Sequence, residues 1–145
     1  MKEPIILVDI DGTLADNQHR QRYLNTEKAD WSAFFDAMIA DKPIMPIVKL
    51  VQELWIGGYK VILVTGRPES HRMDTYNWLV KHQIDHDELL MRQTGDLRAD
   101  VDVKRELIAH IKLEDVEFAL EDHSRMAAMY RELGITCLVV GEDRY

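Results

Sequence analysis

The sequence predicts an α/β fold in which a parallel sheet is flanked by helices and carries a small helical cap insertion. Two observations lead to this prediction. Short apolar runs that suit buried strands alternate along the chain with segments that have helical spacing. No repeat or low-complexity linker interrupts this alternation over the 145 residues, which are enough to bury a core. We therefore expect residues 1–145 to form a single domain, with the cap insertion at about residues 16–42.

The first strand is predicted at Pro4–Val8, because this run is short, uniformly apolar and rich in β-branched residues. Asp9 and Asp11 follow it directly and are separated by one residue, so on an extended backbone both side chains project to the same side. Gly12 then allows the chain to turn. Both carboxylates are therefore expected to face one Mg²⁺ and one phosphate.

The cap insertion is predicted from a polar stretch, residues 16–26, followed by the aromatic amphipathic segment Asp30–Ala40, which we interpret as a short helical element. Trp31, Phe34 and Phe35 are expected to pack this cap. The alternative is that they stack on a nucleobase.

The remaining segments continue the alternation of helices and strands. A helix after Pro46 is expected to end at Gly57-Gly58. Further strands are predicted at Tyr59–Val64, Leu89–Met91, Glu117–Leu120 and Ile135–Val140, and further helices at Met73–His82, Val103–Lys112 and Ser124–Leu133.

Three more polar clusters fall at or just beyond the predicted strand ends. They are Thr65-Gly66-Arg67, Lys104 at the start of a helix, and Glu121-Asp122. Open α/β sheets place their active sites where parallel strands end, so these clusters should converge on Asp9 and Asp11.

The residue types suit the hydrolysis of a phosphate monoester. Asp9 is the candidate nucleophile, which would form an aspartyl-phosphate. Asp11 would act as general acid and then as general base. Thr65 would donate a hydrogen bond to a phosphoryl oxygen, and Lys104 would neutralise Asp9 and the transferred group.

A phosphate dianion repels an anionic nucleophile, so this chemistry requires a bound Mg²⁺. Magnesium prefers oxygen ligands and usually keeps some of its waters. The candidate ligands are Asp9, Asp11 and Asp122, with Glu121 beside them as a possible indirect ligand.

This order of clusters resembles the four motifs of the haloacid dehalogenase superfamily, from Ile6 to about Val140. The resemblance implies a Rossmann-like parallel sheet and phosphatase activity. Closer similarity is to the 3′-phosphatase domain of bacteriophage T4-type polynucleotide kinase/phosphatase, and implies a 3′-phosphorylated nucleotide or nucleic-acid end as substrate and a role in nucleic-acid repair. The segments that carry the closer similarity are Asp9–Leu14, Val64–Ser70, Met91–Asp100, Val103–Glu106 and Glu121–Arg125.

The closer resemblance also implies residues that bind substrate phosphate. An arginine eleven residues after the nucleophile, the arginine of the second motif and an aspartate four residues before the lysine correspond here to Arg20, Arg67 and Asp100, with Gly66 beside Arg67. The sequence departs from the family in having Glu121 where an aspartate is usual. It also has no Gly-x-x-x-x-Gly-Lys-Ser/Thr segment, so we expect no kinase activity.

Composition excludes some classes of protein. The formal net charge of −8 argues against a broad surface that coats nucleic acid, although it allows one terminus to be gripped. No apolar stretch is long enough to cross a membrane, and we expect a cytoplasmic location. Alternatives to a 3′-phosphatase are a nucleoside 5′-monophosphatase or other small-metabolite phosphatase, and a phosphate-sensing domain without turnover. The sequence does not indicate an oligomeric state.

Overall fold

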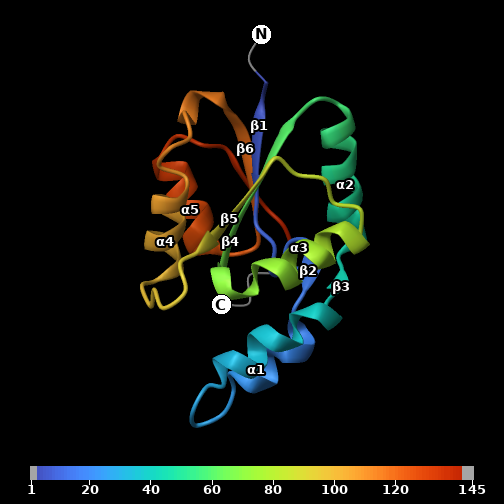
Figure 1. Ribbon diagram of the computed structural model, residues 1–145. Coiled ribbons are helices and arrows are strands. Elements are labelled where there is room, and N and C mark those ends of the chain that lie inside the picture. Colours follow the sequence, from blue (N-terminus) through green and yellow to red (C-terminus); the bar gives the residue numbers. More distant parts are fainter. Residues whose placement is uncertain (1–2, 142–145) are drawn as a thin grey trace.

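The computed structural model describes residues 3–141, and these form a five-stranded parallel sheet with helices on both faces (Figure 1). The strand order is β5-β4-β1-β6-β7. The strands are β1 (Ile5–Val8), β4 (Lys60–Pro68), β5 (Glu88–Arg92), β6 (Val116–Glu121) and β7 (Cys137–Val139). The predicted α/β fold class, with a parallel sheet and flanking helices, is therefore confirmed.

The central strand β1 is buried on both faces, and its residues divide between two apolar clusters. Ile6 and Val8 belong to the cluster that includes residues of α2 (Met45–Ile56) and α3 (Arg72–Lys81). Ile5 and Leu7 belong to the cluster that includes residues of α5 (Ser124–Glu132). Because successive strand residues point to opposite faces, the uniformly apolar run is what a strand covered by helices on both sides requires.

Two elements differ from their predicted bounds in ways that affect the site. The predicted helix Val103–Lys112 is α4 (Asp100–Leu107), so Lys104 lies inside the helix rather than at its start. Asp100 and Asp102 lie in the first turn, where carboxylates stabilise the helix dipole. Strand β4 continues to Pro68, so Thr65-Gly66-Arg67 belongs to the strand, where its pairing register with β5 shifts between Thr65 and Pro68.

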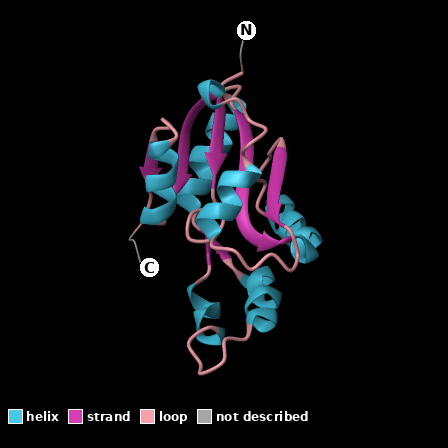
Figure 2. Ribbon diagram, turned by 90° about the vertical axis from the view of Figure 1, so that its left-hand side faces the viewer, coloured by secondary structure: helices cyan, strands magenta, loops and turns pink. Residues whose placement is uncertain are grey.

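Residues 16–42, called the cap segment here, extend away from the sheet (Figures 1 and 2). The two ends of this segment are joined by antiparallel pairing of β2 (Ala15–Asp16) with β3 (Lys42–Pro43). Between them lie the 3-10 helix η1 (Gln18–Tyr23), α1 (Trp31–Asp36) and the 3-10 helix η2 (Ala37–Ala40). The predicted helical segment Asp30–Ala40 is thus an α-helical turn that continues as a 3-10 helix.

Aromatic side chains pack within the cap segment, as expected. Phe34 is buried, and its ring lies edge-on to those of Trp31 and Phe35, with centroid distances of 5.7 and 5.2 Å. Trp31, by contrast, is 55% exposed. Packing therefore accounts for Phe34 and leaves one face of the cap with an exposed indole.

Within residues 3–141, no helix has the length and apolar character needed to span a membrane.

Candidate active site

The loop after β1 brings two carboxylates to the carboxyl edge of the sheet. Asp9 is anchored by its backbone N–H, which donates to the carbonyl of Leu120 on β6 at 3.1 Å. Gly12 has a φ of +83°, a conformation that favours glycine, and a Cβ at this position would overlap the carboxylate of Asp122. Glycine at position 12 therefore lets the loop approach Asp122 closely.

Lys104 links the loop after β1 to the end of β6. Its ammonium Nζ donates to Oδ1 of Asp9 at 2.8 Å and to Oε2 of Glu121 at 2.9 Å, and the side chain is buried. Burial alone would lower the pKa of Lys104, but the carboxylates of Asp9 and Glu121 outweigh it and hold this pKa well above its usual value. The lysine is therefore a fixed positive charge beside Asp9.

The second oxygen of Asp9 is also held. The hydroxyl of Thr13 donates to Oδ2 of Asp9 at 3.0 Å. With Lys104 on Oδ1, both oxygens of the candidate nucleophile have hydrogen-bond donors, which fixes the plane of the carboxylate.

Three carboxylates form a group that could hold a cation. One ligand atom from each of Asp9, Glu121 and Asp122 lies within 4.8 Å of the others, and all three residues are buried. Burial and the neighbouring Glu121 raise the pKa of Asp9 to about 7, in spite of Lys104. Burial and the neighbouring Asp9 raise the pKa of Asp122 to about 9. One ammonium thus fails to balance three carboxylates.

The donor set suits a divalent magnesium ion. Oxygen-only ligands favour hard cations such as Mg²⁺ over Zn²⁺. When all three carboxylates are ionised, one ammonium leaves two negative charges uncompensated, which is the charge that one divalent cation neutralises. Glu121, expected beside the metal ligands, lies within this group and also bonds Lys104.

Asp11, expected among the metal ligands, has its carboxylate outside that group and between two arginines. Arg20 Nη2 donates to Oδ1 of Asp11 at 2.6 Å, and Arg67 Nη2 donates to the same atom at 2.7 Å. Burial would raise the pKa of Asp11, but the guanidinium groups of Arg67 and Arg20 outweigh it and lower this pKa to about 2. Asp11 is therefore held as an anion.

Asp41, which sequence reasoning missed, completes this cluster on its buried side. Its carboxylate is fully buried and accepts from Arg20 Nε at 2.9 Å, Arg20 Nη2 at 2.8 Å and Arg67 Nη2 at 3.3 Å. The Arg20 guanidinium also lies 4.4 Å from the ring centre of Phe34. Nothing local marks Asp41 in the sequence; only the burial of two arginines calls for a second carboxylate.

Arg92, also missed by sequence reasoning, ties the second motif to the following loop. Its guanidinium donates to the carbonyls of Gly66 at 3.0 Å, Asp96 at 2.9 Å and Arg98 at 2.7 Å, and pairs with the carboxylate of Asp100. Asp100, which the sequence predicts to bind substrate phosphate, pairs with Arg92 in the structure. A Cβ at Gly66 would lie 2.7 Å from Oδ1 of Asp100, so the absence of a side chain there allows this contact.

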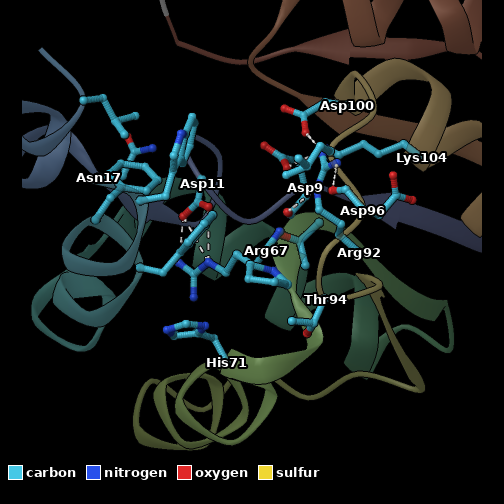
Figure 3. Close-up of a pocket in the computed structure, with 18 of the residues that line it drawn as sticks. Asp9, Asp11, Asn17, Arg67, His71, Arg92, Thr94, Asp96, Asp100 and Lys104 are labelled. Atoms are coloured by element: carbon cyan, nitrogen blue, oxygen red, sulfur yellow. Dashed lines mark hydrogen bonds and ion pairs between the residues drawn. The ribbon is translucent and has the colours of Figure 1, made fainter. Parts of the chain in front are cut away.

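These residues surround one cavity of about 750 Å³ between the sheet edge and the cap segment (Figure 3). Of the sequence-predicted site residues, Arg20 does not line it and instead lies behind Asp11, fully buried. Thr65 lies in the wall, where its hydroxyl accepts from the backbone N–H of Arg67 at 3.1 Å. The predicted site residues that line the cavity are Asp9, Asp11, Thr65, Gly66, Arg67, Asp100, Lys104, Glu121 and Asp122.

Comparison with known proteins gives one matching family and several similar structures. Residues 3–145 match the family described as Polynucleotide kinase PNKP phosphatase domain. A chain in the structure of a Pnkp1/Rnl/Hen1 complex is 33% identical, with a TM-score of 0.80, and the match covers 99% of this chain and 48% of that one. A chain in the structure of the Pnkp1/Rnl/Hen1 RNA repair complex is also 33% identical, with a TM-score of 0.85, and the match covers 99% of this chain and 44% of that one. This chain therefore spans about half the length of these relatives.

More distant structures share the fold. A class C acid phosphatase from Bacillus anthracis, solved with tungstate bound, is 14% identical, with a TM-score of 0.72, and the match covers 100% of this chain and 69% of that one. The haloacid dehalogenase-like hydrolase SP0104 from Streptococcus pneumoniae is 16% identical, with a TM-score of 0.67 and coverage of 98% and 88%.

Proposed function

Because this chain belongs to the family of polynucleotide kinase PNKP phosphatase domains, within the haloacid dehalogenase superfamily, we propose that it is a Mg²⁺-dependent phosphomonoesterase that removes 3′-phosphates from nucleotide or polynucleotide ends. The observation that carries this proposal is the buried pair of Asp9 and Lys104 facing a cavity of about 750 Å³. Ligand pockets for molecules larger than inorganic phosphate have volumes of roughly 300–1,000 Å³. The cavity thus has room for a nucleotide.

In the proposed reaction, a carboxylate oxygen of Asp9 attacks the phosphorus atom. The bond from phosphorus to the 3′-oxygen breaks, the nucleoside oxygen leaves, and the phosphoryl group stays on Asp9. Water then attacks the aspartyl-phosphate, releases inorganic phosphate and regenerates the carboxylate. Lys104 favours the ionised form of Asp9 and neutralises charge on the transferred group, and Thr65 donates to a phosphoryl oxygen.

Asp11 is proposed to move the proton in both steps. It would protonate the leaving 3′-oxygen and then accept a proton from the attacking water. In the substrate-free arrangement, Arg20 and Arg67 keep Asp11 ionised. A phosphate dianion placed beside Asp11 raises its pKa by like-charge repulsion, which favours the protonated form when substrate binds. Arg20 and Arg67 would thus affect the reaction indirectly, by setting the pKa of Asp11.

A Mg²⁺ ion bound by Asp9, Glu121 and Asp122 would supply charge neutralisation for the phosphate dianion. Asp11 remains a proposed further ligand. Because its carboxylate is paired with the arginines, it would bind the ion through its backbone carbonyl oxygen. The residues themselves fit this cation because their donors are all oxygens and their net charge is uncompensated.

The description of one relative supports a nucleic-acid end as substrate, since that chain belongs to a complex described as an RNA repair complex. The net charge of −8 favours recognition of the terminal nucleotide over a long backbone. We therefore propose that rates depend weakly on oligonucleotide length.

The deciding experiment compares kcat/KM for thymidine 3′-phosphate, thymidine 5′-phosphate and a 3′-phosphorylated oligonucleotide in one Mg²⁺ buffer. The 3′-phosphates should be preferred, with similar values for the mononucleotide and the oligonucleotide. Preference for the 5′-phosphate would favour the nucleotidase alternative. Tight binding of all three without turnover would favour a phosphate-sensing domain.

A further inference from the structure

The cavity continues beyond the residues proposed for phosphoryl transfer and reaches the cap segment. Its wall there includes Asn17, Gln21, Trp31 and Phe35, none of which has a role in the proposed chemistry. A volume of about 750 Å³ leaves space beside a phosphate group. When the phosphate group lies at Asp9 and Lys104, the rest of the substrate therefore lies against the cap segment.

Asn17 is the first indication of what this part of the cavity binds. Asn17 is only 4% exposed and lines the cavity, yet among residues 3–141 its side-chain amide has no hydrogen-bond partner (Figure 3). The amide faces the open cavity, so its donor and its acceptor are both available to a ligand. A ligand that offers both a donor and an acceptor would satisfy it.

Gln21 provides a second amide in the same wall. It follows Asn17 by four positions within η1 and is half-buried in the cavity lining. Its side chain likewise makes no hydrogen bond within the described chain. Two amides can each donate and accept, which matches the mixed donors and acceptors along the edge of a nucleobase.

Trp31 provides an apolar face in this wall. Its ring stacks on Phe35 with an interplanar angle of 27° and a centroid distance of 5.9 Å, and Phe35 in turn contacts the ring of His71 at 5.5 Å. These contacts hold the indole from one side, while the residue is 55% exposed and lines the cavity. An exposed, supported aromatic ring is a platform on which a base can stack.

We propose that Trp31, Asn17 and Gln21 form a subsite that binds the nucleobase next to the 3′-phosphate. The inference rests on the proposed function, because the phosphate must lie at Asp9 and Lys104 for the base to reach the cap. In this subsite Trp31 stacks on the base, and the two amides hydrogen-bond its edge. The cap segment thus makes the site selective for nucleotides over simple phosphate esters.

The test uses two secondary phosphate monoesters: thymidine 3′-phosphate, which carries a base and its sugar, and glycerol 2-phosphate, which carries neither. The quantity measured is the ratio of their kcat/KM values. Trp31→Leu should lower this ratio about tenfold, within the range that base stacking contributes, and Asn17→Leu should lower it several-fold. Gln18→Leu removes an exposed amide from the same segment, and Tyr76→Leu removes an exposed ring on α3; both controls should leave the ratio unchanged.

An unchanged ratio in both Trp31→Leu and Asn17→Leu would overturn the subsite. A wild-type protein that hydrolyses both esters equally well would also overturn it, while leaving phosphatase activity intact.

A binding measurement keeps the subsite testable if neither ester is hydrolysed, an outcome that would reject the proposed function. Thymidine 3′-phosphate and inorganic phosphate are titrated into the Asp9→Asn protein with and without Trp31→Leu. The second substitution should weaken nucleotide binding about tenfold and leave phosphate binding nearly unchanged. Equal weakening of both ligands would contradict a base-binding role.

Discussion

Arg67 donates from Nη2 to Oδ1 of Asp11 at 2.7 Å, although 56 residues separate the two in the chain. Arg20 donates to the same oxygen, and Asp41 accepts from both arginines on the buried side. The guanidinium groups of Arg20 and Arg67 therefore hold Asp11 in place, and the buried carboxylate of Asp41 balances part of their charge. This arrangement makes the position of Asp11 depend on a residue that does not itself contact Asp11.

Asp41→Asn should destabilise the protein by about 3 kcal/mol or more, because it leaves two buried guanidinium groups with too little negative charge. For a chain of this size, that loss corresponds to a fall in Tm of roughly 6–12 °C. Asp85→Asn, at an exposed position, is the matched control and should change stability by less than about 0.5 kcal/mol. Equal melting temperatures for the two variants would remove Asp41 from this role.

Asp9→Asn should lower kcat by roughly three orders of magnitude or more, because an amide keeps the shape of the carboxylate but loses its nucleophilicity. The fold should be retained, since Lys104 keeps Glu121 as a partner. Steady-state phosphatase assays with circular dichroism test this prediction, and Asp102→Asn on the exposed face of α4 is the control. Near-normal turnover by purified Asp9→Asn would exclude the covalent mechanism.

Gly12→Ala should impair metal binding more than its backbone strain alone explains. Gly12 and Gly58 both have positive φ, +83° and +95°, so an alanine at either position costs about 1 kcal/mol or more in conformation. Only at Gly12 would the new Cβ also collide with the Asp122 carboxylate. Gly58→Ala is therefore the matched control. The Mg²⁺ concentration for half-maximal activity should rise in Gly12→Ala only; equal values would refute the close approach.

Mg²⁺ should stabilise the protein more at pH 8.5 than at pH 6. The folded-state pKa values of Asp9 and Asp122, about 7 and about 9, lie above the ordinary aspartate value of about 3.9. The folded state therefore binds protons more tightly than the unfolded state. Stability that is present below about pH 4 is lost as the pH rises through these values. A divalent cation replaces the lost protons and offsets the repulsion.

The measurement for this pH dependence is Tm in excess chelator and in excess Mg²⁺ at both pH values. The rise in Tm on adding Mg²⁺ should be larger at pH 8.5, and Asp122→Asn should reduce that difference. A rise that is larger at pH 6 would contradict the assignment of the carboxylate cluster as the metal site.

The sequence alone determined the α/β fold class and the family. The short, β-branched apolar run Ile5–Val8 favours a strand covered on both faces, and polar residues directly after parallel strands meet at one edge of the sheet. That is why Asp9, Thr65 and Asp122 could be grouped without coordinates. Their chemical roles, and the extent of the domain, remain predictions.

Tertiary structure alone decided the partners of each charge. The sequence predicts phosphate-binding roles for Arg67 and Asp100, and only the structure shows that their side chains pair with Asp11 and Arg92. Asp41 carries no local signal, since its role arises only when folding brings Arg20 of the cap segment and Arg67 of β4 against its carboxylate. Strand order and hydrophobic spacing fix where a side chain emerges. Which neighbour it then contacts depends on burial and charge compensation across segments far apart in the chain, which no local pattern records.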